Sequence, residues 1–269
     1  MGRASFRSDS SLTLTRDTSE RRQQISQLVR ERGSVQVAPL AQQFGVSMQT
    51  IRKDLHFLTR RGVAERSYGG AILAGAVNVM AEPEVATKRS IHTDEKVRIG
   101  RLAAAMVEPG ESVVLDSGTT TLQIAHHLLD RDDITALTND LDILVVLARK
   151  KHINIVMLGG LMRRKNMAFY GAQTEGALND LHVDKLFLGV DGFDIDRGIT
   201  THYEPEAILN RKMVEAARSV IAVTDQSKFG RVCLHRIINI DEIDALVTDV
   251  VPDDVAAAAD QLGFSLHLA

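Results

Sequence analysis

The hydrophobic pattern between residues 37 and 61 predicts two short helices joined by a tight turn. Apolar residues recur three or four positions apart, the spacing of one helix face; they are Leu40, Ala41, Phe44, Ile51, Leu55 and Leu58. Pro39 suits the first turn of the first helix, and Gly45 is the residue type that ends a helix. Ser47 can cap the second helix. The pattern is that of a helix-turn-helix.

In a helix-turn-helix, the N-terminal part of the second helix meets base edges in the major groove of DNA. The polar side of the second predicted helix supplies the candidate DNA contacts, which are Ser47, Met48, Gln49, Thr50, Arg52, Lys53 and His56. Two amphipathic helices joined by a glycine turn also occur in ordinary helical bundles. Charge favours double-stranded DNA as the partner, because residues 20–70 hold nine Lys and Arg against four Asp and Glu, whereas the whole chain has a net charge of −3.

Flanking segments extend this motif to a winged helix. A helix that precedes the motif ends at Gly33, and residues 63–73 predict two short strands around Gly69 and Gly70, a hairpin signal. Arg66 and Tyr68 near the hairpin tip are candidates for contact with phosphate or the minor groove, although Tyr68 can equally pack on the helices.

Domain boundaries follow from changes in the pattern. Residues 1–16 are rich in Ser, Arg and Thr and have no period, so we expect a disordered tail. The winged helix-turn-helix domain then covers residues 17–73. Residues 74–92 are aperiodic and contain Pro83, which predicts a linker. Residues 93–269 are expected to form a larger second domain.

Within residues 93–269, apolar runs alternate with helical patterns. The runs cover residues 112–115, 134–137, 154–158, 185–190 and 219–224. Continuous β-branched runs separated by helices are typical of a buried, mostly parallel sheet flanked by helices. The expected fold is therefore an α/β domain that follows an N-terminal winged helix-turn-helix domain.

Small and polar residues follow each predicted strand, at the edge of the sheet where ligands gather in such folds. The strongest group is residues 116–121, DSGTTT, which precede a predicted helix. A helix N-terminus favours phosphate, although such a run can also be only a capped turn. The candidate binding residues are Asp116, Ser117, Gly118, Thr119, Thr120, Thr121, Thr138, Asn139, Gly159, Gly160, Asp191, Gly192 and Lys228. Lys228 can supply a cation to an anionic ligand, or it can be an ordinary surface lysine. Tyr170 and Gly171 can line the pocket, or they can simply pack within a loop.

Other classes of site are disfavoured. The single cysteine, Cys233, excludes an intrachain disulfide, and no apolar run approaches the ~20 residues of a membrane span. His126 and His127 are adjacent on a predicted helix and do not face one ion together, so no metal or cofactor is expected. We expect a cytoplasmic protein without a membrane partner.

Two sets of motifs carry a resemblance to a known family. RRQQI, followed by SVQVAPLAQQFGVSMQTIRKDLHFLTRRGVAERSYGGAI, resembles the N-terminal domain of the DeoR family of bacterial repressors. DSGTTT, the TN pair, LGG, FYG, LGVDGFD, the Glu206-Ala207 pair and TDQSKF resemble the effector domain of that family. The resemblance covers most of the chain.

This resemblance implies a fold and a function. The effector domain of the family is similar in fold to ribose-5-phosphate isomerase and glucosamine-6-phosphate deaminase. Its effectors are typically phosphorylated sugars, with the phosphate at the SGTT-type loop, and on this basis Glu206 joins the expected effector-binding residues. Family members bind operators near sugar-catabolism genes. This chain looks closest to regulators of amino-sugar or galactose-derivative pathways, such as N-acetylgalactosamine catabolism.

An enzyme with a DNA-binding appendage is the alternative. Asp191 and Asp194 resemble the carboxylate pair of the pentose-phosphate isomerase, which suits acid/base work on an aldose. Where that isomerase has a lysine before a glycine run, this chain has Arg197, and an always-protonated arginine is a poor proton shuttle. The sequence therefore predicts a sugar-phosphate-responsive repressor that binds without turnover. Recognition of paired half-sites predicts a homodimer or homotetramer.

Overall fold

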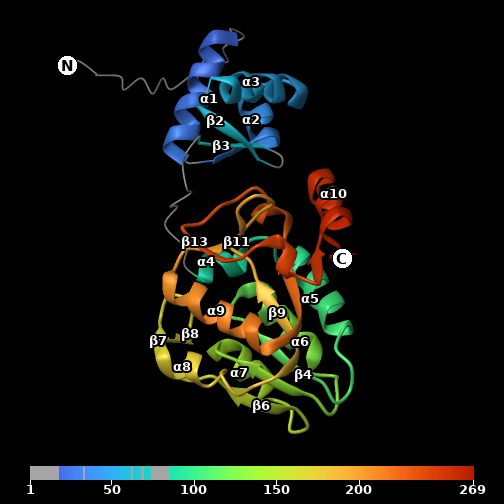
Figure 1. Ribbon diagram of the computed structural model, residues 1–269. Helices are drawn as coiled ribbons and strands as arrows, with labels where there is room; N and C mark the ends of the chain where they lie inside the picture. Colours follow the sequence, from blue (N-terminus) through green and yellow to red (C-terminus); the bar gives the residue numbers. More distant parts are fainter. Residues whose placement is uncertain (1–17, 33, 62, 68–69, 74–84) are drawn as a thin grey trace, which may run out of the picture. The chain divides into compact units, whose positions relative to one another are not determined.

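The computed structural model describes residues 18–32, 34–61, 63–67, 70–73 and 85–269. The chain divides into two compact units, residues 1–76 and residues 77–269. The first unit is the blue-to-cyan part of Figure 1, and the second runs from teal to red. A small N-terminal unit therefore precedes a larger one.

The described residues of the first unit contain three helices with a shared core. The helices are α1 (Thr18–Arg32), α2 (Val37–Phe44) and α3 (Met48–Arg60). Ile25 of α1, Leu40 of α2 and Ile51 of α3 are all buried in one cluster. The apolar stripes that predicted these helices are therefore the surfaces that hold them together.

Local residues explain where α2 ends and α3 begins. Gly45 follows α2 in a left-handed conformation with φ 62°, which glycine adopts without strain. The Ser47 hydroxyl accepts a hydrogen bond from the Thr50 N–H at 3.1 Å and caps α3. The predicted helix-turn-helix is confirmed.

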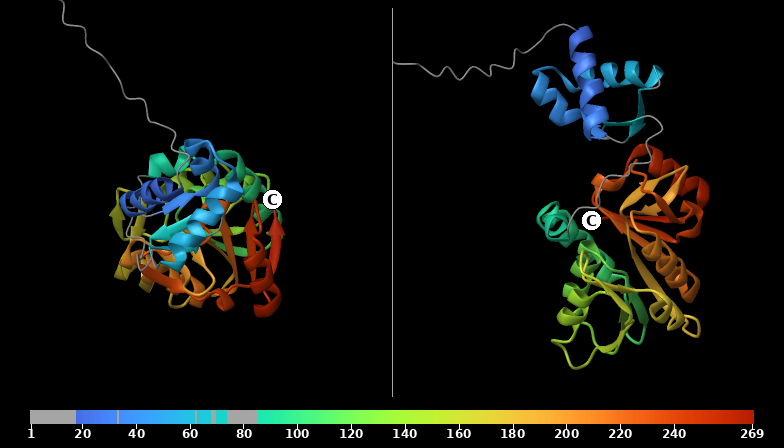
Figure 2. Two further views of the ribbon diagram at one scale, coloured as in Figure 1. Left: turned by 90° about the horizontal axis from the view of Figure 1, so that it is seen from above. Right: turned by 90° about the vertical axis from the view of Figure 1, so that its left-hand side faces the viewer.

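A three-stranded antiparallel sheet completes the first unit (Figure 2). Its order is β1 (Ser34–Gln36), β3 (Gly70–Leu73), β2 (Ala64–Ser67). The β2-β3 hairpin is confirmed, whereas β1 was not predicted. Gly70 is the first residue of β3, and a Cβ at this position would lie 2.0 Å from the Val35 carbonyl oxygen of β1. The close approach of β1 therefore requires glycine there.

The second unit is built on a seven-stranded sheet in which all neighbouring strands are parallel. The strand order is β15-β14-β12-β9-β4-β5-β6. The strands are β4 (Ser112–Leu115), β5 (Thr135–Thr138), β6 (Asn154–Met157), β9 (Val183–Gly189), β12 (Ala217–Thr224), β14 (Ala245–Thr248) and β15 (Ser265–Leu268). The first five correspond to the predicted runs, and β14 and β15 were not predicted.

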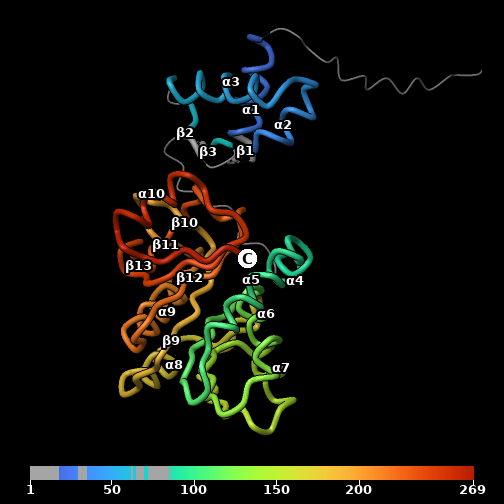
Figure 3. The backbone as a smooth tube through the Cα atoms, turned by 90° about the vertical axis from the view of Figure 1, so that its right-hand side faces the viewer, coloured from blue at the N-terminus to red at the C-terminus, as the bar shows by residue number. Residues whose placement is uncertain are grey.

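Helices cover both faces of this sheet. One core joins β4 through Val113 and Leu115 to α5 (Thr93–Ala105), α6 (Thr119–Leu128) and α7 (Leu141–Leu147). The other joins β4 through Val114 to α9 (Glu204–Ala216) and α10 (Asp253–Leu262). Successive side chains of a strand point to opposite faces, so a strand buried on both faces is apolar throughout. α6 and α9 lie on opposite sides of β9 (Figures 1 and 3). The predicted α/β fold is confirmed.

Shorter elements surround the sheet. β10 (Gly192–Asp194), β11 (Gly198–Thr201) and β13 (His235–Ile238) form a small antiparallel sheet, and β7 (Leu161–Arg163) pairs with β8 (Ala168–Tyr170). The remaining pieces are α8 (Ala172–Gly176) and single 3-10 turns at Gln226–Lys228 and Ile240–Glu242. Within the described residues, no helix has the length and apolar character needed to cross a membrane.

One helix lies where a linker was predicted. α4 (Val85–Ser90) falls within residues 74–92 and packs on the second unit. The Val85 N–H donates to the Lys165 carbonyl oxygen at 3.4 Å, and Arg89 forms an ion pair with Asp142. The linker prediction is therefore wrong for residues 85–90. Residues 74–84 and the predicted tail lie outside the described residues.

Candidate functional site

The residues of α3 that were predicted to contact DNA lie on its exposed side. Met48 is 51% exposed, and Gln49, Arg52, Lys53 and His56 are also exposed. The Ser47 and Thr50 hydroxyl oxygens lie 2.9 Å apart at the start of the helix. The side chain of Arg66 and the whole of Tyr68 lie outside the described residues. One face of α3 thus presents polar and basic groups together.

A buried carboxylate joins α3 to α1. Asp54 is 1% exposed, and its Oδ2 and Oδ1 each lie 2.7 Å from a guanidinium nitrogen, Arg21 Nε and Arg22 Nε respectively. The Arg22 and Arg61 guanidinium groups also lie 4.1 Å and 4.8 Å from the centre of the Phe57 ring. Part of the basic charge that favoured DNA binding therefore orients α3 within the unit.

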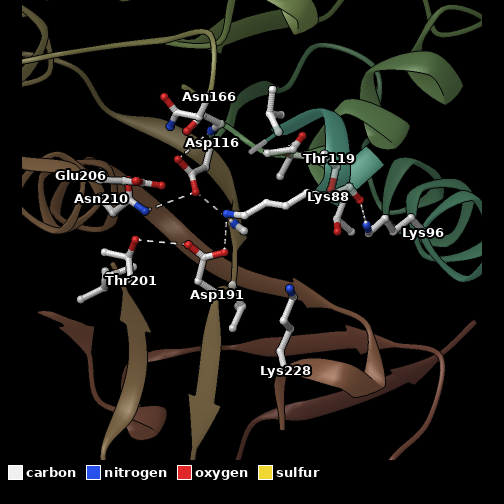
Figure 4. A pocket seen from close by; sticks show the side chains of 18 residues that line it. Lys88, Lys96, Asp116, Thr119, Asn166, Asp191, Thr201, Glu206, Asn210 and Lys228 are labelled. Atoms are coloured by element: carbon white, nitrogen blue, oxygen red, sulfur yellow. Dashed lines mark hydrogen bonds and ion pairs between the residues drawn. The ribbon is translucent and has the colours of Figure 1, made fainter. Parts of the chain in front are cut away.

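A pocket in the second unit, here called the main pocket, opens at the carboxyl ends of β4 and β9. The chain proceeds from β4 outward to β6 and from β9 outward to β15 on the other side, so the two strands flank the switch point of the sheet. Ligands bind at this place in open α/β folds. The main pocket encloses about 620 Å³, including its open mouth. Figure 4 labels Lys88, Lys96, Asp116, Thr119, Asn166, Asp191, Thr201, Glu206, Asn210 and Lys228 among its lining residues.

Residues 117–121 line the main pocket where α6 begins. Gly118 takes φ 157° and ψ 166°, a conformation that residues with side chains rarely adopt. The N–H groups of the first helical turn have no carbonyl partner inside the helix, so they are available to an anion. The Ser117 hydroxyl oxygen is buried and has no hydrogen-bond partner among the described residues. The loop therefore presents donors that an oxyanion can satisfy.

Three lysines line the main pocket. Lys88 Nζ of α4 lies 2.8 Å from Asp191 Oδ1. Lys96 Nζ donates to the carbonyl oxygens of Lys88 and Ile91 at 2.5 Å and 2.7 Å, which leaves one N–H of its ammonium for a further acceptor. Lys228 points into the pocket (Figure 4). Burial lowers the pKa of Lys96 and of Lys228, so an anion would meet these cations in a desolvated environment.

Asp116 is a buried carboxyl group in the main pocket. Its Oδ1 accepts the Ser117 N–H at 2.7 Å, and its Oδ2 accepts the Gly189 N–H and Asn210 Nδ2, both at 3.2 Å. Burial outweighs these hydrogen bonds and raises the pKa of Asp116 to about 7. Burial also raises the pKa of Asp140, to about 6. Both carboxyl groups therefore change charge close to neutral pH.

Asp191 behaves in the opposite way. Burial alone would raise its pKa, but the ammonium groups of Lys88 and Lys228 outweigh burial and lower the pKa to about 2. The Thr201 hydroxyl lies 3.5 Å from Asp191 Oδ2. Among the described residues, no group of three or more His, Cys, Asp or Glu is arranged to hold a metal ion.

The structure brings together a subset of the predicted effector-binding residues. Those that line the main pocket are Asp116, Ser117, Gly118, Thr119, Thr120, Thr121, Asp191, Glu206 and Lys228. Asn139 and Tyr170 line a smaller adjoining cavity. The residues that line neither cavity are Thr138, Gly159, Gly160, Gly171 and Gly192.

Two of the latter are glycines required by packing. A Cβ on Gly160 would lie 2.2 Å from Thr174 Oγ1, and one on Gly192 would lie 2.5 Å from the Arg231 carbonyl oxygen. These positions therefore lack a side chain because the surrounding chain leaves no room for one.

The other three lie outside the main pocket for separate reasons. Gly159 follows β6, the edge strand, and Gly171 precedes α8 with φ 97°. Thr138 ends β5, and its hydroxyl accepts the Asp140 N–H at 3.1 Å. Gly159 is therefore separated from β4 by β5, Gly171 belongs to the segment after β8, and the Thr138 hydroxyl is engaged within its own turn.

The main pocket also contains polar residues that were not predicted, namely Lys88, Lys96, Asn166, Thr201 and Asn210. Two of them carried a signal, because Lys96 and Asn210 interrupt apolar helix stripes, each three residues before a buried apolar residue, Ile99 or Met213. Asp54 has the same signal on α3, three residues after Ile51. A polar residue on a buried stripe requires a partner.

Comparison with known proteins identifies the family. The chain matches the DeoR-like helix-turn-helix domain over residues 21–76 and the DeoR C terminal sensor domain over residues 91–250. It is 45% identical to an aga operon transcriptional repressor of Escherichia coli O157:H7 over 232 residues, 86% of each protein. It is 33% identical to the glycerol-3-phosphate regulon repressor of Escherichia coli K12, over 87% of this chain and 91% of that protein.

Among solved structures, ribose 5-phosphate isomerase A from Methanocaldococcus jannaschii is similar with a TM-score of 0.39 and 15% identity, over 51% of this chain and 54% of that chain. The sensor-domain match alone covers more than half of this chain, and the relatives are similar along most of their length. The chain therefore belongs to the DeoR family of transcriptional regulators.

Proposed function

We propose that a phosphorylated sugar binds in the main pocket with its phosphate at residues 117–121, and that its binding changes the affinity of α3 for operator DNA. One observation carries the proposal: the donors at the start of α6 and the lysines converge on the same pocket. A phosphate offers acceptor oxygens to the donors and negative charge to the lysines.

α4 provides a route by which the pocket can influence the DNA-binding unit. It is the first described helix of the second unit, and its Lys88 is paired with Asp191 inside the pocket. A phosphate bound beside this pair would compete with Asp191 for the Lys88 ammonium group. The position of α4 would therefore depend on whether the pocket is occupied. Such coupling requires that the effector bind two arrangements unequally, and typical coupling energies are about 1–3 kcal/mol.

The geometry supports binding without turnover. Asp191, with a pKa lowered to about 2 and a lysine partner, is a poor proton acceptor near neutral pH. Asp194 accepts the Arg197 N–H at 2.9 Å and does not line the main pocket. The two carboxylates of the isomerase alternative are therefore not arranged around one ligand. Purified protein should not interconvert or deaminate sugar phosphates above background, and turnover abolished by Asp191→Asn would favour the enzyme.

Recognition of DNA by one α3 offers few base contacts, so we infer that two or four copies act together on paired half-sites. A homodimer or homotetramer follows, and binding to bacterial operator DNA places its action in the cytoplasm. Sedimentation of the protein with and without operator DNA measures the number of copies. A monomer on a single half-site would contradict this part of the proposal.

A pair of substitutions at Thr119 tests the phosphate site. Thr119 is the first residue of α6 and lines the main pocket. Thr119→Glu places a carboxylate where the phosphate is proposed, and Thr119→Gln adds nearly the same bulk without charge. We expect both variants to bind operator, and the Glu variant alone to lose its response to a panel of hexose phosphates in gel-shift assays. Equal sugar-phosphate affinities of the two folded variants, measured by calorimetry, would place the phosphate elsewhere.

A further inference from the structure

A second cavity adjoins the main pocket, and we call it the side chamber. It shares Ser117, Asn166 and Glu206 with the main pocket and encloses about 210 Å³, including its opening. Its other walls come from the end of β5, the β7-β8 hairpin and the start of α9. A ligand whose phosphate is held at residues 117–121 can therefore extend past Ser117 into the side chamber.

Asn139 is fixed in the wall of the side chamber with one acceptor unused. Its Nδ2 donates to the Phe169 carbonyl oxygen at 2.9 Å, and its backbone carbonyl accepts the Phe169 N–H at 2.8 Å. The amide is oriented by its donor, which identifies the other amide atom as Oδ1. Asn139 is 2% exposed, and Oδ1 has no hydrogen-bond partner among the described residues. A buried acceptor in this state is unfavourable, and a donor group on a ligand would relieve it.

Aromatic side chains form another part of the side chamber. The Tyr170 and Tyr203 rings pack edge to face with their centroids 5.5 Å apart. The Arg163 guanidinium lies 4.2 Å from the Tyr203 ring centroid, and its Nη1 lies 3.7 Å from Glu206 Oε2. The side chamber thus offers acceptors and ring surface, with its cation already engaged. It suits a hydroxyl- or amino-bearing carbon better than a second phosphate.

We propose that the side chamber is the specificity subsite of the sensor. There Asn139 Oδ1 accepts a hydrogen bond from a hydroxyl or amino substituent at the end of the sugar remote from its phosphate. This inference rests on the proposed function, because the phosphate must be held at residues 117–121 for the substituent to reach Asn139. A site that pairs a buried polar group with a ligand group discriminates strongly against an analogue that lacks it. The phosphate site supplies affinity for the class of ligand, and Asn139 selects within the class.

Calorimetry on the full-length protein tests this subsite. The probes are glucose and galactose 6-phosphates in which each ring hydroxyl is replaced in turn by hydrogen or an amino group. Wild-type protein should lose at least about tenfold in affinity when one particular hydroxyl is replaced by hydrogen. Asn139→Leu should bind the parent sugar phosphate as weakly as that deoxy analogue and lose nothing further from the replacement, because donor and acceptor form a single interaction.

Controls separate the subsite from the phosphate site. Inorganic phosphate, which cannot extend into the side chamber, should raise the Tm of wild type and Asn139→Leu equally. Asn154→Leu, at an exposed position of β6, should discriminate like wild type. If Asn139→Leu does not fold because the Phe169 carbonyl loses its donor, the wild-type protein is tested with the analogue that carries fluorine in place of that hydroxyl. Fluorine cannot donate a hydrogen bond to Asn139 Oδ1, so this analogue should bind as weakly as the deoxy analogue, and undiminished affinity would refute the subsite.

Two results would overturn the inference at different levels. Equal discrimination by wild type and Asn139→Leu for every analogue, with sugar phosphates still bound, would refute the subsite and leave the phosphate site standing. Failure of wild-type protein to bind any probe, inorganic phosphate included, would refute the proposed function and this inference with it.

Discussion

Lys88 Nζ lies 2.8 Å from Asp191 Oδ1, so α4 is tied to the segment that follows the carboxyl end of β9. The pair is largely buried, with side-chain exposures of 17% and 15%. Lys96 of α5 also holds α4 in place, because its Nζ donates a hydrogen bond to the Lys88 carbonyl oxygen. A change of charge in the main pocket would therefore act directly on α4.

Lys88→Gln should weaken both effector binding and the response of DNA affinity to the effector. Hydrogen bonds to charged groups contribute about 1.5–3 kcal/mol, so we expect sugar-phosphate affinity to fall at least about tenfold. Fluorescence anisotropy of labelled operator, titrated with hexose phosphates, measures binding and response together. Arg98→Gln, at an exposed position of α5, is the matched control. A normal response from Lys88→Gln would show that α4 does not sense the pocket.

The raised pKa of Asp116 makes the stability of the second unit depend on pH. A folded-state pKa of about 7 against an ordinary 3.8 means that the folded state favours the protonated form. The resulting stabilisation is fully present below the ordinary pKa and is lost as pH rises through about 7. Asp116→Asn stays neutral at both pH values. The free energy of unfolding of Asp116→Asn minus that of wild type should therefore be about 2 kcal/mol larger at pH 8 than at pH 5.5. Urea denaturation at both pH values checks this, and a pH-independent difference would contradict it.

Arg52→Ala should weaken operator binding by about 1–3 kcal/mol without unfolding the first unit, because Arg52 lies on the exposed side of α3. Gel-shift assays at several salt concentrations measure the affinity and its salt dependence. Arg101→Ala removes the same charge from an exposed position of α5 and should leave operator binding unchanged. Wild-type affinity of Arg52→Ala would mean that another surface reads the DNA.

Asp54→Asn should destabilise the first unit by about 3–5 kcal/mol, because it leaves the buried Arg21 guanidinium without its counter-charge. Arg22→Gln should cost less, since the Arg22 side chain is 27% exposed and Asp54 keeps Arg21. Hydrogen exchange of the α3 amides reports on this unit separately from the other. Equal protection of the α3 amides from hydrogen exchange in Asp54→Asn and wild type would show that the Asp54 ion pairs with Arg21 and Arg22 do not hold α3 in place.

The first unit was largely predictable because its signals are local. Gly45 and Ser47 determine the helix boundaries through contacts within a few residues. β1 escaped prediction because it is three residues long, and its pairing with β3 joins Val35 to Ala71, far apart in the chain. Pairing at that separation leaves no period in the sequence.

In the candidate site, the sequence predicted mainly the residues that directly follow a strand. Asp116 and Asp191 were both predicted, but their convergence follows from β4 and β9 being neighbours, which the order of elements along the chain does not reveal. The same reasoning grouped Gly159 and Gly160 with these aspartates, but neither glycine lines the main pocket, because β6 is the edge strand and β5 separates it from β4. Lys88 lies in an aperiodic segment, and only its long-range ion pair gives it a role.

The place of Lys88 in α4 also sets where this sensor could be joined to other proteins. A chimera that begins at Thr93, where the sheet domain was expected to start, would discard Lys88 and remove both carbonyl oxygens that hold Lys96. A junction before Val85 would keep these groups and both cavities in one transferable piece. A sensor module taken from this chain should therefore include the six residues of α4, although their sequence alone resembles a linker.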